Sequence, residues 1–163
     1  MSLLRVFLLL AIGFGVSACG SKFKSYDGPP ITSIQVHKED RKMYLVSDGK
    51  IAAAYDIALG TNPIGHKQFE GDGKTPEGAY RISHKNPDSS YHLSLGISYP
   101  DNVDREYAAK LGKPPGGDIF IHGGPRGKIK NKDWTVGCIA VTDKEIEEIY
   151  AMVPENTPIY IFE

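Results

Sequence analysis

The chain has 163 residues and nearly balanced charge, with 19 lysines and arginines against 20 aspartates and glutamates and a formal net charge of −1. This balance excludes the basic surplus that nucleic-acid binding requires. The length suits one domain with a real hydrophobic core and leaves little room for a second.

The N-terminal segment has the layout of a secretory signal. Arg5 is followed by an apolar run over residues 6–16 and by small residues up to Cys19. The run is too short to span a bilayer as a helix, so it predicts a signal peptide over residues 1–18, with a buried N-terminal helix as the alternative. The sequence VSAC resembles the lipobox of bacterial lipoproteins, which implies that Cys19 carries lipid. Gly20 is not the aspartate that retains many lipoproteins in the inner membrane, so we expect an outer-membrane anchor at the periplasmic face.

The segment that follows Cys19 is polar and rich in turn-forming residues, without hydrophobic periodicity. Residues 19–30 are therefore expected to form a lipid-anchored tether. The remaining residues, 31–163, show no internal repeat and are expected to form a single domain.

The first part of this domain has the pattern of β-strands. A strand is predicted over residues 31–38, and two more over residues 42–59, joined at Asp48 and Gly49. That dipeptide suits a tight hairpin turn. Residues 60–78 carry no apolar pattern, and a loop of that length inside a compact domain is usually functional or mobile.

Two helices and further strands complete the pattern. The first helix is predicted from Asp101, a plausible cap, to Gly112, and the second begins with a capping box of Thr142 and Glu145 and ends at Pro154. Further strands are predicted at residues 79–83, 91–99, 118–123 and 158–162. Strands dominate without regular alternation with helices, which predicts a mainly β fold, a mostly antiparallel sandwich or barrel with a few short helices.

Cys138 is the cysteine that remains once Cys19 is assigned to lipid. An unpaired cysteine in an exported protein indicates an intermolecular disulfide or a reactive thiol, with a buried inert cysteine as the alternative. A thiol with the usual pKa of roughly 8.5 needs a base or a positive charge to become a nucleophile. His122, sixteen positions earlier at the end of a predicted strand, is the best candidate base. We therefore expect Cys138 to be partly thiolate at neutral pH.

The neighbours of Cys138 support this interpretation. Gly137 allows close approach of the backbone to a substrate, and amides in a tight turn can point at a developing oxyanion. Thr135 offers a hydroxyl to the same region. The alternative is an ordinary turn that contains a buried cysteine.

The other histidines carry weaker signals. His66 lies in the long loop and could touch substrate, whereas a surface or core position is expected for His37, for His84 at the start of a polar loop, and for His92 in a strand. The sequence has neither a CxxC motif nor a pair of histidines with helical i, i+4 spacing, so neither a metal nor another cofactor is expected.

Three segments together resemble the L,D-transpeptidase catalytic domain, also called the YkuD domain. IHGG at 121–124 and TVGCIAV at 135–141 look like the His-Gly and Ser/Thr-x-Gly-Cys signature of that family. GDGKTPEGAYRI at 71–82 resembles its Thr-Pro-x-Gly segment. The resemblance covers about residues 34–162.

The resemblance implies a β-rich fold in which residues 31–163 form the catalytic domain and Cys138 is the nucleophile. His122 would act as base and then as acid, with a backbone carbonyl near Gly123 holding its ring tautomer, a role that aspartate plays elsewhere. The amides of Gly137 and Cys138 would be the oxyanion donors.

The substrate implied by the resemblance is a peptidoglycan stem tetrapeptide, cleaved after the L-centre of residue 3, usually diaminopimelate, with release of D-Ala. The acyl group would pass to an amine of another stem, giving a 3-3 crosslink, to an outer-membrane protein, or to water. Val136 stands where the family often has histidine, and Ala140 where it often has arginine or asparagine; both departures bear on substrate preference.

Other functions remain open at this point. One alternative is a cysteine peptidase or amidase of the same fold, and another is a non-catalytic peptidoglycan-binding lipoprotein. Sortases use an arginine after the cysteine, and residues 139–163 contain none.

A basic loop lies between the two catalytic candidates. Its positive residues, Arg126, Lys128, Lys130 and Lys132, could attract the carboxylates of a stem peptide. The alternative is a solvated loop whose lysines keep the surface soluble.

Overall fold

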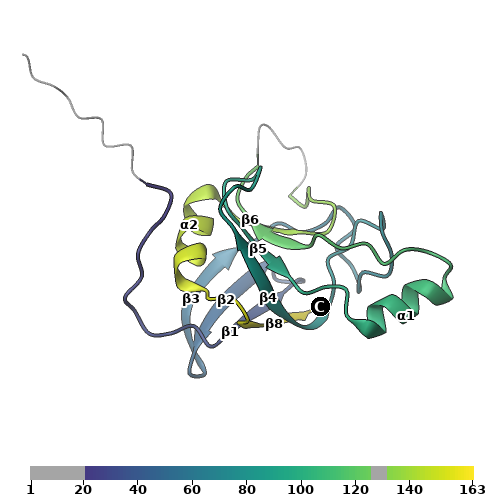
Figure 1. Cartoon of the computed structure of the whole chain (residues 1–163), viewed down its shortest axis with the longest axis horizontal. Coiled ribbons are helices and arrows are strands. Elements are labelled where there is room, and N and C mark those ends of the chain that lie inside the picture. The colour runs from purple at the N-terminus through teal and green to yellow at the C-terminus, as the bar shows by residue number, and fades with distance from the viewer. Residues whose placement is uncertain (1–20, 126–131) are drawn as a thin grey trace, which may run out of the picture.

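The computed structural model describes residues 21–125 and 132–163 (Figure 1). Its elements are β1 (Ser33–His37), β2 (Lys42–Ser47), β3 (Lys50–Asp56), β4 (Gly78–Asn86), β5 (Ser94–Ile97), α1 (Asn102–Lys110), β6 (Phe120–His122), β7 (Ile139–Ala140), α2 (Asp143–Met152) and β8 (Pro158–Phe162). The mainly β fold with short helices is confirmed. The predicted signal peptide, Cys19, Arg126, Lys128 and Lys130 lie outside the described residues.

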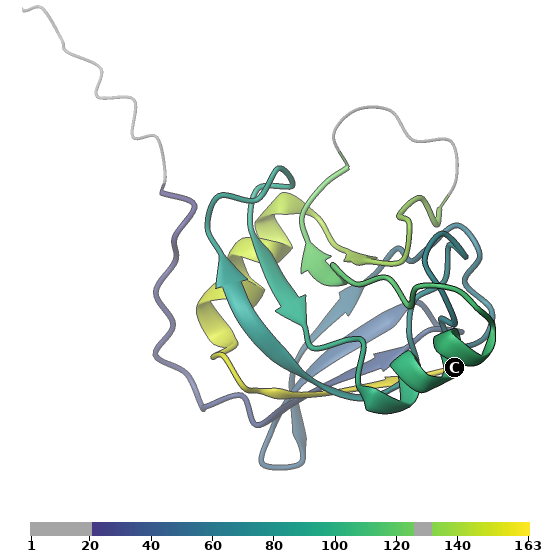
Figure 2. The same ribbon diagram turned by 45° about the vertical axis from the view of Figure 1, so that its right-hand side comes forward.

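The strands form one sheet in the order β3-β2-β1-β8-β4-β5-β6-β7. Most neighbours are antiparallel, as predicted, but β1 pairs with β8 and β6 with β7 in parallel. Figures 1 and 2 show the sheet curling, so that β4, β5 and β6 lie in front of β1, β2 and β3. The core lies within this curl, where strand side chains such as Ile34, Leu45 and Ile121 are fully buried.

Local signals in the sequence place the hairpin and both helices correctly. Asp48 and Gly49 have φ angles of 47° and 77°, the left-handed values that a type I′ turn requires between β2 and β3. Asp101 caps α1, and Thr142 and Glu145 form the capping box of α2. Helix α2 packs against β5 and β6, close to the site described below. In the described part of the chain, no helix is long and apolar enough to cross a membrane.

Two histidines lie in different elements from those predicted. His84 belongs to β4, which continues to Asn86, because mostly exposed polar side chains on this strand hide its alternation. His92 lies in a turn before β5 and has a left-handed φ of 75°, so the predicted strand over 91–99 begins only at Ser94.

The start of the described chain has neither helix nor strand but contacts the domain. The Phe23 ring lies 6.2 Å from the ring of Tyr150 in α2, centroid to centroid. Lys22 Nζ donates to the carbonyl oxygen of Pro87 at 2.6 Å. The segment predicted to be a tether therefore docks on the domain surface in this structure.

Candidate active site

Two neighbouring parallel strands bring His122 and Cys138 together. Pairing of β6 with β7 aligns Ile121 with Ile139 and His122 with Ala140, and Cys138 immediately precedes β7. Both side chains line one cavity of about 320 Å³. The two residues are sixteen positions apart in the sequence because parallel strands need a long connection. Pairing of the strands then brings the two side chains to one cavity.

The imidazole of His122 is buried, with 4% of the residue exposed. Its Nδ1 lies 2.7 Å from the carbonyl oxygen of Gly123. Because a carbonyl oxygen only accepts hydrogen bonds, Nδ1 carries the proton and Nε2 is the nitrogen that can act as a base. The expected backbone carbonyl is therefore in place.

Aromatic rings fix the plane of this imidazole. The ring of Tyr91 lies 4.4 Å from that of His122, and Trp134 approaches edge-on at 5.6 Å, centroid to centroid. Sequence reasoning missed both residues. Trp134 directly precedes the TVGC motif, which is a signal of proximity, whereas nothing local marks Tyr91.

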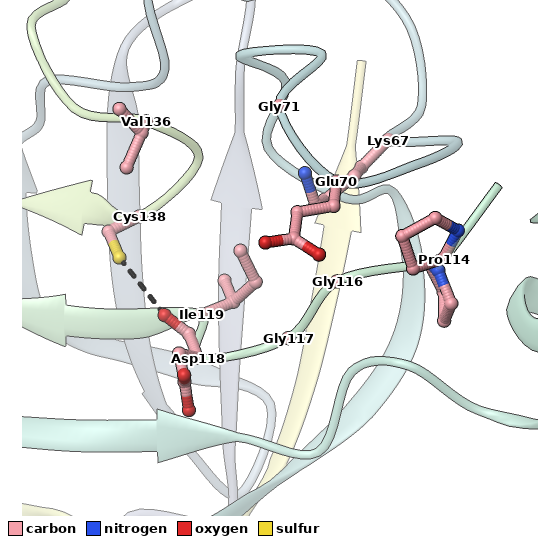
Figure 3. A pocket seen from close by; sticks show the side chains of 11 residues that line it. Lys67, Glu70, Gly71, Pro114, Gly116, Gly117, Asp118, Ile119, Val136 and Cys138 are labelled. Atoms are coloured by element: carbon pink, nitrogen blue, oxygen red, sulfur yellow. Dashed lines mark hydrogen bonds between the residues drawn. The ribbon is translucent and has the colours of Figure 1, made fainter.

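The thiol of Cys138 donates to the backbone oxygen of Asp118 at 3.5 Å (Figure 3). Burial raises the pKa of Cys138, and the Asp118 carboxylate raises it further, while a backbone hydrogen bond from Phe120 and the charge of Lys67 oppose them. The net direction is upward, so the prediction of a partly ionised thiol at neutral pH is wrong for the resting site. For the sulfur to act as a nucleophile, a neighbouring base would have to remove its proton.

Thr135 organises the turn that carries the thiol. Its hydroxyl donates to the carbonyl oxygen of Cys138 at 2.7 Å and accepts from the N–H of Gly137 at 3.2 Å. The Gly137 amide is thus engaged within the turn, which argues against its expected role as an oxyanion donor and leaves the Cys138 amide as the candidate. Gly137 has a φ of 137°, and a Cβ there would lie 2.7 Å from the carbonyl oxygen of Lys74. Only glycine fits this position.

Gly123 supports the histidine through packing. A Cβ at Gly123 would lie 2.6 Å from Asp143 Oδ1 and 2.9 Å from the carbonyl oxygen of Tyr91. Its N–H donates to that same carbonyl at 3.1 Å. The absence of a side chain therefore lets the chain after β6 pass between α2 and the Tyr91 turn.

A second cavity, of about 640 Å³, lies on another side of Cys138 (Figure 3). The long loop supplies Lys67, Glu70 and Gly71 to its wall, so the unpatterned loop borders the site. Val136, at 80% exposure, also lines this cavity beside the thiol.

Some predicted positions lie elsewhere. Lys132 is exposed and lines a different cavity, with Trp134, that includes neither Cys138 nor His122. The Nε2 of His66 lies 3.0 Å from Asp104 Oδ1, which ties the long loop to α1. Among residues 21–125 and 132–163, no group of three or more His, Cys, Asp or Glu side chains is arranged to hold a metal ion.

Comparison with known proteins agrees with this geometry. A family model described as "L,D-transpeptidase catalytic domain" (YkuD) matches residues 31–161. A curated protein of Escherichia coli K12 named "Putative L,D-transpeptidase YafK" is 32% identical over 132 residues, covering 77% of this chain and 48% of that protein.

Solved structures share the fold. The helical cell shape determining protein Pgp2 from Campylobacter jejuni is similar with a TM-score of 0.65 at 30% identity, covering 85% of this chain and 49% of that one. The catalytic domain from the Enterococcus faecium L,D-transpeptidase has a TM-score of 0.56 at 20% identity, covering 80% of this chain and 96% of that domain. The latter likeness concerns the fold alone. The chain spans about half the length of YafK and Pgp2.

Proposed function

The chain belongs to the L,D-transpeptidase catalytic domain (YkuD) family, and on that basis we propose that it is a peptidoglycan L,D-transpeptidase with Cys138 as nucleophile and His122 as general base. The observation that carries this proposal is the shared cavity of the two side chains, which lie on adjacent strands. The hydrogen bond from Nδ1 to the Gly123 carbonyl supports it, since it directs the basic nitrogen of the ring away from the backbone.

In the first half-reaction, His122 Nε2 takes the proton of the Cys138 thiol while the sulfur attacks the carbonyl carbon at the L-centre of residue 3 in a stem tetrapeptide. The C–S bond forms and the carbonyl oxygen becomes an oxyanion, which the Cys138 amide can stabilise. The C–N bond to D-Ala then breaks, and His122 returns its proton to the leaving amine. A thioester remains on Cys138.

The second half-reaction reverses these roles. An acceptor amine loses a proton to His122 and attacks the thioester, the new C–N bond forms, and the C–S bond breaks with return of the proton to the sulfur. The acceptor is an amine of a second stem peptide, giving a 3-3 crosslink, or an amine of an outer-membrane protein. Water in the same position would release a tripeptide instead.

The proposed setting is the periplasm, with the protein attached to the outer membrane through lipid on Cys19. The sequence resemblance to a lipobox supports this placement. The peptidoglycan substrate lies in the same compartment.

The test is to incubate the purified protein with disaccharide tetrapeptides and to follow both protein and products by intact mass. We expect an adduct on Cys138 that lacks D-Ala, followed by crosslinked dimers. Cys138→Ala should form no adduct, and His122→Ala should lower turnover by about 10²- to 10⁴-fold, the usual contribution of a general base. Wall binding without adduct or product would contradict the proposal and favour a binding protein, whereas tripeptide alone would indicate hydrolysis.

A further inference from the structure

The larger cavity beside Cys138 carries charges of both signs that the acyl-transfer steps do not use. Lys67 is only 3% exposed and lines this cavity together with Glu70. Figure 3 shows the Glu70 side chain extending from the long loop into the cavity, on the side that faces Cys138. A fixed cation and a carboxylate thus lie within one hollow at the nucleophile.

The ammonium of Lys67 is held in place but retains donor capacity. Its Nζ donates to Asp72 Oδ1 at 2.9 Å and to the carbonyl oxygen of Phe69 at 3.1 Å. An ammonium has three N–H donors, and within the described part of the chain these are its two acceptors. A further acceptor, such as a ligand carboxylate in the cavity, would satisfy the third.

Asp72 forms a buried ion pair with Lys67, and backbone N–H groups complete the hydrogen bonding of its carboxylate. Burial acts to raise the pKa of Asp72, but hydrogen bonds from Lys67 and from the N–H groups of Gln68, Phe69 and Lys74 leave the pKa lowered. The carboxylate therefore organises the loop, with Lys67 fixed at the cavity wall.

A backbone hydrogen bond places Glu70 at the cavity. Its N–H donates to the carbonyl oxygen of Pro114 at 2.9 Å, which joins the long loop to the segment before β6. Its side chain is exposed to the cavity, where a carboxylate can accept from a ligand ammonium.

We propose that this cavity binds the zwitterionic head group of an α-amino acid, with the carboxylate on Lys67 and the ammonium on Glu70. This inference rests on the proposed function and deepens it, since the head group would then lie next to the attacking sulfur. A ligand with both charges gives an acceptor to the third N–H of Lys67 and a donor to the Glu70 carboxylate, whereas a ligand with one charge leaves one of these two groups without a ligand partner.

Two sources would supply such a head group. One is the distal centre of the diamino acid at position 3 of the donor stem. The other is the same centre of an incoming acceptor, whose amine must lose its proton before it attacks.

The direct test measures protection of Cys138 from iodoacetamide, which is uncharged and needs no turnover. D-Alanine should slow alkylation of the purified protein in a saturable manner at neutral pH. D-Alaninamide, which lacks the carboxylate, and propionate, which lacks the ammonium, should each require at least tenfold higher concentrations. Equal protection by all three compounds, or none by D-alanine, would overturn the proposal.

Two variants test which residue binds the carboxylate of the ligand and which binds its ammonium group. Glu70→Gln should abolish the preference for D-alanine over propionate, and Lys67→Met should abolish the preference over D-alaninamide. Glu106→Gln, an equal charge change on the exposed face of α1, is the matched control. D-Alanine should slow alkylation of Cys138 in this variant as much as in the parent protein. Because the charge of Lys67 also lowers the pKa of Cys138, protection of each variant is expressed relative to its own alkylation rate without ligand. Glu70→Gln keeps the test decisive by itself.

A second arm distinguishes the sources. Tetrapeptides with an amidated distal carboxylate should form the adduct at least tenfold more slowly if the donor occupies the cavity. If the acceptor occupies it, adduct formation should be unchanged while crosslinking falls. Unchanged rates in both steps would overturn the inference even though turnover, and with it the proposed function, remained; protection without any turnover would contradict the proposed function alone.

Discussion

The state of a single thiol decides how this site must work. Cys138 was expected to be partly ionised beside His122, yet burial raises its pKa, and the nearby Asp118 adds to the effect. The resting site would therefore hold a protonated thiol, and under the proposed function His122 would act only while a substrate carbonyl is attacked. The nucleophilicity of the Cys138 sulfur would then depend on the bound substrate as well as on the pairing of Cys138 with His122.

A pH profile of alkylation tests this at the residue scale. The rate of Cys138 alkylation by iodoacetamide should rise with a midpoint above roughly 8.5, the pKa of a free cysteine, because only the thiolate reacts. The same profile on a short unstructured cysteine peptide is the control. A midpoint below that of the peptide would indicate a stable thiolate–imidazolium pair and contradict the raised pKa.

At the scale of elements, an ion pair between Arg41 and Asp133 anchors the segment that leads to Cys138. Arg41, just before β2, donates from Nε and Nη2 to the Asp133 carboxylate, with Nη2 at 2.8 Å from Oδ2. Asp133 also accepts from the N–H of Leu59 at 3.0 Å. The residue before Trp134 is thereby tied to the turn before β2 and to the segment after β3, which places the following turn.

Because of this ion pair, the stability of the fold should decrease as the pH becomes acidic. Burial acts to raise the pKa of Asp133, but the bonds from Arg41 and Leu59 leave it lowered. A lowered carboxyl pKa contributes stability that is complete above the unfolded pKa of about 3.9 and is lost as pH falls through the folded pKa. Asp133→Asn should thus lower Tm at pH 7, with a cost of about 1–3 kcal/mol. Its Tm should also fall less than that of the parent between pH 5 and pH 3, as followed by circular dichroism.

The control is Asp56→Asn. Asp56 is also paired, with Lys42, but its side chain is 82% exposed, and exposed pairs contribute little. Its Tm should match that of the parent protein at pH 7. If Asp133→Asn behaved in the same way, the anchoring role of the Arg41 pair would be wrong.

At the scale of the whole molecule, the segment before β1 connects the proposed membrane anchor to the active-site region. Lys22 donates to the carbonyl oxygens of Pro87 and His92, on either side of the turn that carries Tyr91. Tyr91 in turn packs on the imidazole of His122. A segment expected to be only a tether thus contacts the turn that packs on His122, the proposed general base.

Truncation separates the anchor from the docked segment. The Cys19→Ser protein should no longer be found in the membrane fraction. A chain that starts at Ser21 should fold and react with iodoacetamide like the parent protein. A chain that starts at Ile31 should have a Tm lower by about 2–8 °C, because it loses roughly 1 kcal/mol of contacts to α2 and the Tyr91 turn. Equal Tm values for the two truncated chains would show that docking does not stabilise the domain, and a Cys19→Ser protein still in the membrane would contradict the lipid anchor.

Sequence reasoning succeeded where the deciding chemistry is local. The turn at Asp48 and Gly49 and the capping box of Thr142 and Glu145 depend on residues within four positions of one another, and both were predicted correctly. His92 was placed in a strand, because an alternating pattern does not reveal that the chain turns there with a positive φ.

The sequence by itself determined the family resemblance, the strand-rich pattern and the identity of the candidate nucleophile and base, since these depend on residue types and short spacings. Only the tertiary structure decided that β6 and β7 lie side by side, that Tyr91 packs on His122, and that Lys67 and Glu70 share a cavity with Cys138. It also decided the direction of the thiol pKa. The physical reason is that desolvation and charge act through space, so they depend on neighbours that sequence distance does not specify.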